Sequence, residues 1–288
     1  MHRVRTILLY PVMALLLALG VMLGLSSAAG ASTASASHAS GPAAAARAAL
    51  NHLRLFHIGH HSPALWVPAS PQRIDNQTVV ESTNWSGYAD TGSNFSQAAG
   101  SWTEPSASCS GRTTSYAAFW VGIDGYSSDS VEQDGTLIEC YRGHAYQYSW
   151  WEMYPTNDIQ VVGETVAAGD SITASVVVSG TSYTLAVTDS THPANSFSTT
   201  QTCTDCANSS AEWIAEAPSG SSGILPLADF GTWTESGATV TEGTTPGVIS
   251  TFTDDEITMV DSRGLVKAQP GALNSSGNGF SDTWERSS

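Results

Sequence analysis

The sequence predicts an all-β fold, a single antiparallel sandwich or barrel formed by the chain from about residue 84 onward. Apolar and polar residues alternate with period two in short stretches rich in β-branched and aromatic side chains, and Gly, Ser, Asn and Asp separate the stretches. No convincing amphipathic helix follows residue 80. Roughly a dozen short strands in about 210 residues fit one domain. The clearest expected strands are Ser115–Val121, Tyr146–Tyr154, Ser171–Val178, Tyr183–Thr188, Ala211–Ala217 and Ile257–Val260.

An export signal precedes this domain. Arg3 and Arg5 are followed by an apolar run from Ile7 to Leu25 and then by small residues through Ala36. The run is long, so a membrane anchor is the alternative, but small-residue cleavage sites follow at once and stop-transfer charges do not. We therefore predict a signal peptide at residues 1–36. No later stretch reaches the roughly 18 apolar residues of a spanning helix, so we expect a secreted, extracellular product without a membrane partner.

The next segment, residues 37–74, differs in composition from the rest and is predicted to be a propeptide, with the mature domain at 75–288. It contains an Ala-rich patch and then a stretch rich in His and Pro, and six of the eight histidines of the chain precede Asp75. One hypothesis is that this basic segment covers an acidic cleft at neutral pH. A disordered spacer is the alternative.

Charge divides the chain at the same place. All 26 acidic residues lie at Asp75 or beyond, together with five of the ten basic residues, which gives the mature part a net charge of −21. Such a surface disfavours nucleic acids and anionic membranes as partners. Protonation of carboxylates relieves the self-repulsion, so the domain is suited to an acidic medium. Charged residues make up 12% of the chain, about half the usual share, which is typical of a secreted β protein.

The four cysteines fit an oxidising compartment. Cys109, Cys140, Cys203 and Cys206 allow three pairings, of which Cys109–Cys140 with Cys203–Cys206 is favoured. A zinc site formed by all four is the alternative, which the single CxxC disfavours. We expect no metal and no other cofactor.

The usual catalytic nucleophiles are poorly represented in the mature part. It holds two histidines, His144 and His192, no GxSxG motif and no HExxH motif. These features disfavour a Ser-His-Asp triad and catalytic zinc, and paired cysteines disfavour a thiol nucleophile. The string Asp90-Thr91-Gly92-Ser93 matches pepsin-like peptidases, but such enzymes need a second copy and none exists. We interpret it as a polar turn after a strand near Trp85–Ala89.

Carboxylates remain, and several strings that contain them resemble one family. The strings keep their order and run through most of the mature chain: Asn84–Gly87 (NWSG), Gly100–Pro105 (GSWTEP), Phe119–Gly125 (FWVGIDG), Ser130–Gly135 (SVEQDG), Tyr148–Pro155 (YSWWEMYP), Ala211–Glu216 (AEWIAE) and Leu227–Thr232 (LADFGT). Together they resemble the glutamic peptidases called eqolisins. The resemblance implies a lectin-like β-sandwich of two large antiparallel sheets. It also implies a secreted, pepstatin-insensitive acid endopeptidase that acts on proteins or peptides, and we expect a monomer.

The resemblance also implies which residues form the site. Glu212 and Gln133 would be catalytic, and five neighbours would bind substrate: Trp120, Asp124, Trp150, Glu152 and Tyr154. Strand alternation supports part of this set, because residues two apart share a face of a sheet. Trp150, Glu152 and Tyr154 then point to one face and Trp151 and Met153 to the other, while Glu212, Ile214 and Glu216 oppose Trp213.

Two other functions suit a lectin-like sandwich with aromatic residues. A glycoside hydrolase would use a pair of carboxylates, for which Glu132 and Asp134 are candidates. A carbohydrate-binding module would have affinity for sugars without cleaving protein.

Overall fold

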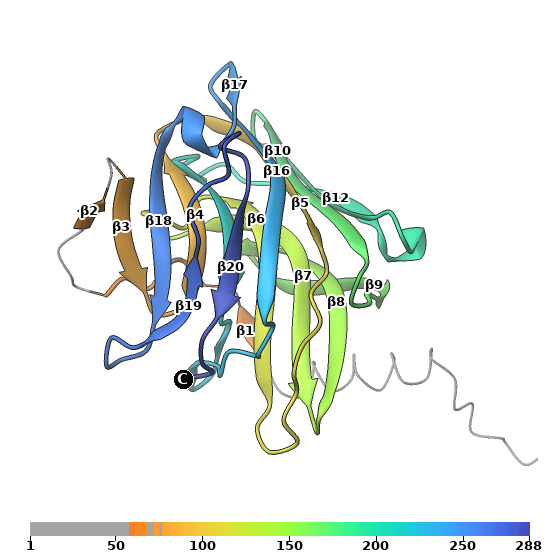
Figure 1. Cartoon of the computed structure of the whole chain (residues 1–288). Coiled ribbons are helices and arrows are strands. Elements are labelled where there is room, and N and C mark those ends of the chain that lie inside the picture. The colour runs from red at the N-terminus through yellow and green to blue at the C-terminus, as the bar shows by residue number, and fades with distance from the viewer. Residues whose placement is uncertain (1–57, 61, 68–71, 75–76) are drawn as a thin grey trace, which may run out of the picture. The chain divides into compact units, whose positions relative to one another are not determined.

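The computed structural model describes residues 58–60, 62–67, 72–74 and 77–288 (Figure 1). The predicted signal peptide at 1–36 lies outside these residues, as does much of the predicted propeptide at 37–74. Within the described part of the chain, no helix is long and apolar enough to cross a membrane.

Nearly all regular structure is β, as predicted, and the two helical segments are single 3-10 turns. In chain order the elements are β1 (Ile58–His60), β2 (Gln72–Ile74), β3 (Gln77–Ser82), β4 (Trp85–Thr91), β5 (Phe95–Thr103), β6 (Ser115–Ile123), β7 (Val131–Tyr141), β8 (His144–Tyr154), β9 (Asn157–Thr165), β10 (Ser171–Ser179), β11 (Ser182–Asp189), η1 (Pro193–Asn195), β12 (Phe197–Thr202), β13 (Ser210–Glu216), β14 (Ser219–Gly220), β15 (Gly223–Ile224), β16 (Thr232–Glu242), β17 (Thr245–Gly247), η2 (Ile249–Thr251), β18 (Thr253–Val260), β19 (Val266–Pro270) and β20 (Phe280–Trp284).

The strands form two large sheets. The first sheet runs β3, β18, β4, β13, β6, β7, β8, β9, and its pairs are antiparallel except the parallel pair β3–β18. The second runs β12, β11, β10, β5, β16, β17. Strand β19 pairs with β18 and strand β20 pairs with β19, so both belong to the first sheet. Strand β16 belongs to both sheets, because Thr232–Glu235 pair with β20 and Ser236–Glu242 pair with β5. Figure 1 shows β16 between β20 and β5. The predicted sandwich of two antiparallel sheets is confirmed.

Each expected strand occurs, with ends that differ by a few residues. The largest change is in β18, which begins at Thr253 rather than Ile257. The strand predicted near Trp85–Ala89 continues through Asp90 to Thr91, and the turn begins at Gly92. The interpretation of Asp90 as a turn residue was therefore wrong. Its carboxyl group is buried inside the fold, where alternation along β4 places it beside the core.

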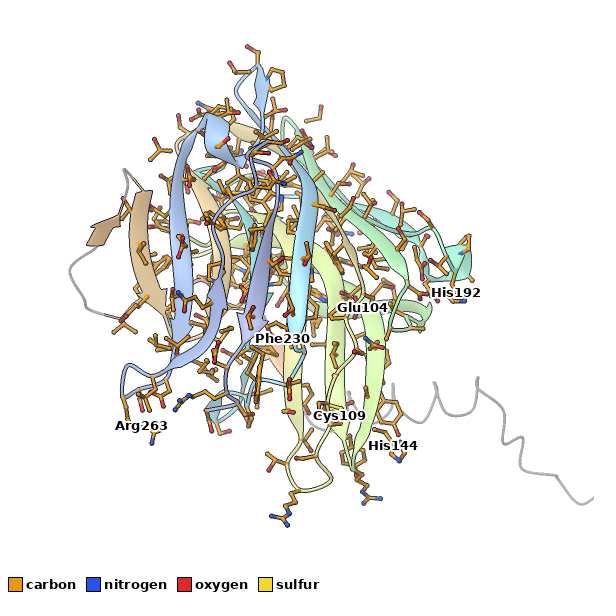
Figure 2. The ribbon with its side chains drawn as sticks, viewed as in Figure 1. Glu104, Cys109, His144, His192, Phe230 and Arg263 are labelled. Atoms are coloured by element: carbon orange, nitrogen blue, oxygen red, sulfur yellow. A yellow bond between two sulfur atoms is a disulfide. The ribbon has the colours of Figure 1, made fainter. Side chains whose placement is uncertain are left out.

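The main core lies between the two sheets. Tyr88, Phe119 and Trp213 contribute to it from the first sheet, and the Phe119 ring stacks on Trp233, with ring centroids 5.3 Å apart. Phe230 joins the same core and Glu104 is buried within the fold, whereas the two histidines, His144 and His192, are exposed (Figure 2). The disulfides are Cys109–Cys140 and Cys203–Cys206, so the favoured pairing is confirmed.

The opposite face of the first sheet carries a second, smaller apolar cluster. Trp85, Trp120, Trp150 and Ile214 belong to it, and all are fully buried. We call this the catalytic face, because the residues predicted to be catalytic lie on it.

Candidate active site

Strand register places the two predicted catalytic residues in one row. Glu212 on β13 is opposite Gly122 on β6, which is opposite Gln133 on β7, which is opposite Glu152 on β8. Directly opposite residues project from the same face. Because Gly122 has no side chain, Glu212 and Gln133 face one another above it. Two strand spacings separate their backbones by roughly 9.6 Å, a gap that two long side chains and one water can fill.

Alternation along the strands separates this row from the core, as predicted. Trp150 belongs to the cluster on the catalytic face, with Tyr154 packed against it, whereas Met153 belongs to the main core, with Trp151 packed against that core. Likewise Ile214 lies on the catalytic face and Trp213 lies in the core. The strand neighbours of Glu212 and Glu152 pack in the main core. This packing holds the two glutamates rigidly on the catalytic face.

Glu212 lies in an unusual environment for a carboxyl group. It is completely buried, and neither of its oxygens has a hydrogen bond of good geometry among the described residues, although the Ser210 side chain favours the ionised form and so lowers the pKa. Burial raises the pKa of Glu212 well above its usual range, and the nearby carboxylates of Asp124, Glu132 and Asp90 raise it further.

Gln133 is held by its neighbour in the row. Its Nε2 donates a hydrogen bond to Oε2 of Glu152, 3.3 Å away, and both side chains are fully buried. An amide nitrogen carries two hydrogens, so Gln133 can donate to more than one acceptor. Glu152, predicted to line the cleft, thus orients the amide.

Two tryptophans border the row on one side. Trp120 is opposite Gly135, which is opposite Trp150. The Trp120 indole nitrogen donates to Oε2 of Glu216 at 2.9 Å. Its ring lies close to Gly122, since a Cβ added at that glycine would come within 2.7 Å of Cζ3. Tyr154 lies at the end of β8, opposite Val131, and is half-buried.

Asp124 acts on the loop that precedes β13. It has a positive φ of 71°, and its carboxylate accepts hydrogen bonds from the backbone N–H of Asn208 and Ser209 and from the Ser209 hydroxyl, each 2.8–2.9 Å long. Asp124 therefore fixes the chain directly before Glu212.

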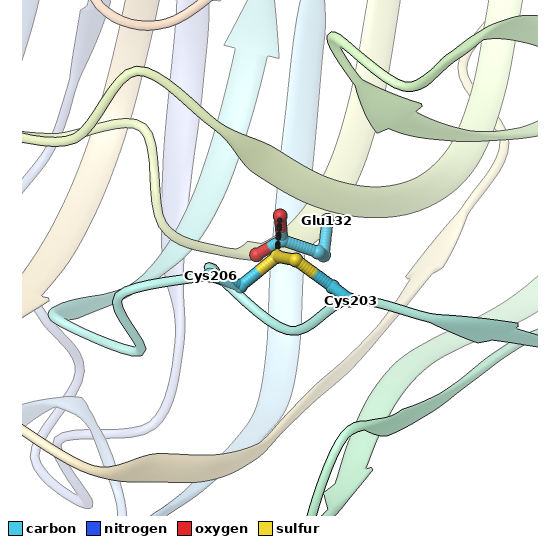
Figure 3. Close-up of side chains that lie close together, drawn as sticks. All are labelled: Glu132, Cys203 and Cys206. Atoms are coloured by element: carbon cyan, nitrogen blue, oxygen red, sulfur yellow. Dashed lines mark hydrogen bonds between the residues drawn. A yellow bond between two sulfur atoms is a disulfide. The ribbon is translucent and has the colours of Figure 1, made fainter.

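Glu132 and Asp134 face away from Gln133 into the sandwich, as strand alternation requires. Oε1 of Glu132 lies 2.9 Å from Sγ of Cys206 in the Cys203–Cys206 disulfide (Figure 3). A disulfide sulfur carries no hydrogen and cannot donate to this carboxyl group. Burial, together with the nearby Asp124, raises the pKa of Glu132 to about 9. Burial likewise raises the pKa of Asp134 well above its usual range.

Two clusters among the described residues have the composition of a metal site: Glu132 with the two disulfide-bonded cysteines, and a group of Asp170, Asp189 and His192. Oxygens of Asp170 and Asp189 and a ring nitrogen of His192 lie within 4.8 Å of one another. His192 Nδ1 contacts Asp170 Oδ1 at 2.8 Å, while Asp189 accepts from two backbone N–H groups and from Asn195. The carboxylates are thus already used to hold the turn around η1.

Sequence reasoning missed the loop that covers the row. The Tyr126 hydroxyl hydrogen-bonds to Asp255 of β18, which is opposite Ala89, which in turn is opposite Glu212. The loop after β6 therefore passes over Glu212. Gly122 was also missed as a separator, although a glycine inside a strand pattern is a known signal of close approach.

Comparison with known proteins gives a consistent family assignment. A model of the Peptidase A4 family matches residues 83–275. Aspergillopepsin-2 of Aspergillus niger is 28% identical over 209 residues, which are 64% of this chain and 74% of that protein. Scytalidopepsin B of Scytalidium lignicola is 36% identical over 116 residues, which are 39% of this chain and 42% of that protein.

Solved structures share the fold. A scytalido-glutamic peptidase with a transition state analog inhibitor aligns with a TM-score of 0.60 and 22% identity, over 70% of this chain and 98% of that one. Aspergilloglutamic peptidase from Aspergillus niger aligns with a TM-score of 0.52 and 27% identity, over 59% of this chain and 99% of that one.

Proposed function

Since the chain belongs to the Peptidase A4 family, the eqolisins, and is therefore a peptide-bond hydrolase, we propose that Glu212 and Gln133 are its catalytic pair and that it works as a secreted acid endopeptidase. The observation that carries the proposal is the row in which only Gly122 separates the two side chains.

The chemistry requires an activated water and a donor for the oxygen that becomes negative. Glu212 as a carboxylate removes a proton from the water, which attacks the carbonyl carbon of the scissile bond. The oxygen of the tetrahedral intermediate accepts a hydrogen bond from the Gln133 amide. Glu212 then returns the proton to the leaving nitrogen, and the C–N bond breaks.

An amide suits this role in acid, because it does not titrate there and remains a donor. Glu212 must be ionised to act as a base, and this requires water to reach it. Burial beneath the covering loop raises the pKa of Glu212 well above its usual range, so uncovering the row lowers that pKa toward the ordinary value of about 4.3. An acidic optimum follows.

The neighbouring residues have supporting roles in this proposal. Glu152 orients the Gln133 amide, and Trp120, Trp150 and Tyr154 form the wall along the substrate. Asp124 positions the chain before Glu212. No cofactor takes part. The alternative glycoside hydrolase is not favoured, because Glu132 and Asp134 project into the interior of the sandwich.

We further propose that residues 1–36 direct secretion, that 37–74 are a propeptide, and that 75–288 are the mature, monomeric enzyme. The described parts of the 37–74 segment contact the domain. Strand β1 pairs with β14, β2 pairs with β3, and Trp66 forms a bridge with Ser82.

The test is digestion of an unfolded protein between pH 2 and 7, with pepstatin present, by wild type and Glu212→Gln. Acid activity that resists pepstatin and falls by two to four orders of magnitude in the variant is expected. Glu104→Gln is the matched control, because Glu104 is a buried glutamate outside the row. A Glu212→Gln protein with undiminished activity would exclude this residue as the base, and pepstatin-sensitive activity would point back to Asp90.

A further inference from the structure

We propose that Asn84, Trp85 and Gly125 form a subsite for the backbone of an extended peptide substrate, which residues 62–66 of the same chain occupy before activation. This inference rests on the proposed peptidase function. It adds a binding surface on the catalytic face, at a distance from Glu212 and Gln133.

The contacts are those that a peptide ligand makes. Asn84 Nδ2 donates to the carbonyl oxygens of Ser62 and Pro63, at 3.3 and 3.2 Å, and its Oδ1 accepts from the backbone N–H of Leu65 at 2.8 Å. The Trp85 indole nitrogen donates to the same Ser62 oxygen at 3.1 Å. On the other side, the backbone N–H of Ala64 donates to the carbonyl of Gly125 at 3.0 Å.

The side chains of Asn84 and Trp85 are covered when residues 62–66 are bound. The side chains of Asn84 and Trp85 are 0% exposed. If residues 62–66 depart, both donors lose the peptide carbonyl oxygens that they bind here. Departure of the segment also uncovers both side chains, so water and the Glu216 carboxyl group then take the place of those carbonyl oxygens. An incoming peptide carbonyl restores these bonds, so the vacated surface favours another extended chain.

Recognition through these contacts depends mainly on backbone. Leu65 and Trp66 are 43% and 36% exposed, so their side chains are only partly enclosed. Trp66 makes a specific side-chain contact: its ring centroid lies 4.6 Å from that of Tyr126, and its indole nitrogen donates to the Tyr126 carbonyl at 2.9 Å. The Ser62 hydroxyl makes a second, since it lies 3.1 Å from the Ser219 hydroxyl and accepts from Asn84 Nδ2 at 3.3 Å. The subsite should therefore accept many sequences and prefer an aromatic residue at the place of Trp66.

The position along the sheet fixes the distance from the reacting bond. A hydrogen bond from the Ser62 backbone is among the contacts that lower the pKa of Glu216 against the larger effect of burial. Glu216 is four residues beyond Glu212 on the same face, roughly 13 Å along the strand. The subsite thus binds substrate residues about four positions from the scissile bond, and long substrates gain from it where short ones do not.

The test uses the full-length secreted protein after activation in acid. Mass spectrometry gives its N-terminus, and a blocked peptide Ser-Pro-Ala-Leu-Trp is added as inhibitor of a long and of a short substrate. We expect an N-terminus beyond residue 66 and competitive inhibition with the long substrate. A matched peptide with N-methylalanine in third place loses the bond to Gly125 and should bind at least tenfold more weakly.

Calorimetry with acid-activated protein measures the same peptides without turnover. Asn84→Asp keeps the acceptor for Leu65 but removes the donor, and it should weaken the pentapeptide about tenfold, whereas Asn274→Ala in an exposed turn should not. The proposal is overturned if the active enzyme retains residues 62–66 or if the N-methylated peptide binds equally well. Failure of the Glu212 assignment is a separate result, seen as retained activity in Glu212→Gln.

Discussion

The two faces of the first sheet are made by the same strands and have opposite properties. Toward the second sheet, Trp213 and Phe119 pack in an apolar core, whereas one residue away Glu212 projects into a row of polar side chains. Alternation thus places rigidity and chemistry in adjacent positions of one strand. Substitutions on the core face should change stability, and substitutions on the catalytic face should change turnover.

Two buried glutamates make the same contrast. Glu104 accepts hydrogen bonds from Trp102, Thr136 and Gln147, at 3.2, 2.7 and 3.0 Å. Among the described residues, Glu212 has only the Ser210 side chain to favour its ionised form, without a hydrogen bond of good geometry. A satisfied carboxyl group stabilises a fold, while an unsatisfied one is available to bind a water or substrate.

The largest expected effect is on the core face. Trp213→Ala removes a fully buried side chain and its hydrogen bond to the Ala99 carbonyl, and it should lower the free energy of unfolding by about 3–5 kcal/mol. Urea denaturation at pH 4 measures this. The folded fraction should retain turnover within tenfold. Val177→Ala, at a position 43% exposed, is the control with little effect. A Trp213→Ala protein that loses turnover but keeps its stability would contradict the contrast between the core face and the catalytic face.

On the catalytic face, Gln133→Glu removes the amide donor while keeping the shape of the side chain. We expect kcat to fall by about 10²–10³, with the urea midpoint at pH 4 nearly unchanged. Gln160→Glu, at an exposed position on β9, is the control. Full activity in Gln133→Glu would show that the oxyanion is stabilised by another group.

The pH dependence of stability tests the interior carboxyl groups. Burial raises the pKa of Glu104 and of Asp282 to about 7 and that of Asp90 to about 9. Because the folded state holds these protons more tightly, stability is full below about pH 4 and falls as pH rises through 7 to 9. For Glu104 alone, moved from 4.5 to about 7, the loss is about 3 kcal/mol.

Urea unfolding at pH 3, 5 and 7 measures this loss. Asp282→Asn mimics the neutral acid and should flatten the decline above pH 5. Stability that increases from pH 4 to 7 would contradict the expected protonation of these groups.

The smallest effect concerns the separator in the row. A Cβ at residue 122 would lie 2.7 Å from Cζ3 of Trp120 and 3.3 Å from the Glu132 carbonyl oxygen. Gly122→Ala should therefore displace the Trp120 ring and lower kcat/KM about tenfold. Gly111→Ala is the control, since its Cβ would meet nothing within 4 Å. Equal kinetics for the two variants would show that the gap above Gly122 is not used.

Local pattern predicted the strands, the face on which each side chain lies and the disulfide pairing. The strands and the faces follow from the period-two alternation of apolar and polar residues. Disulfide formation follows from the oxidising compartment expected for the chain. Local pattern did not predict that Glu212, Gly122 and Gln133 share a row, because register between β13, β6 and β7 depends on pairing across about 90 residues. The loop over Glu212 was missed for a similar reason: Tyr126 meets Asp255, whose sequence separation is 129. The turn was predicted to start at Asp90 because the residues from Asp90 to Ser93 favour turns. Strand β4 instead continues to Thr91.

Strand β16 has a mechanical consequence. Its first half is hydrogen-bonded into one sheet and its second half into the other, so pulling the sheets apart would break backbone ladders as well as side-chain packing. The sandwich should therefore behave as a stiff frame. Any movement that admits a polypeptide to the catalytic face must come from the Tyr126 loop and the segment that includes Ser62, whose attachments can be released without disturbing the frame.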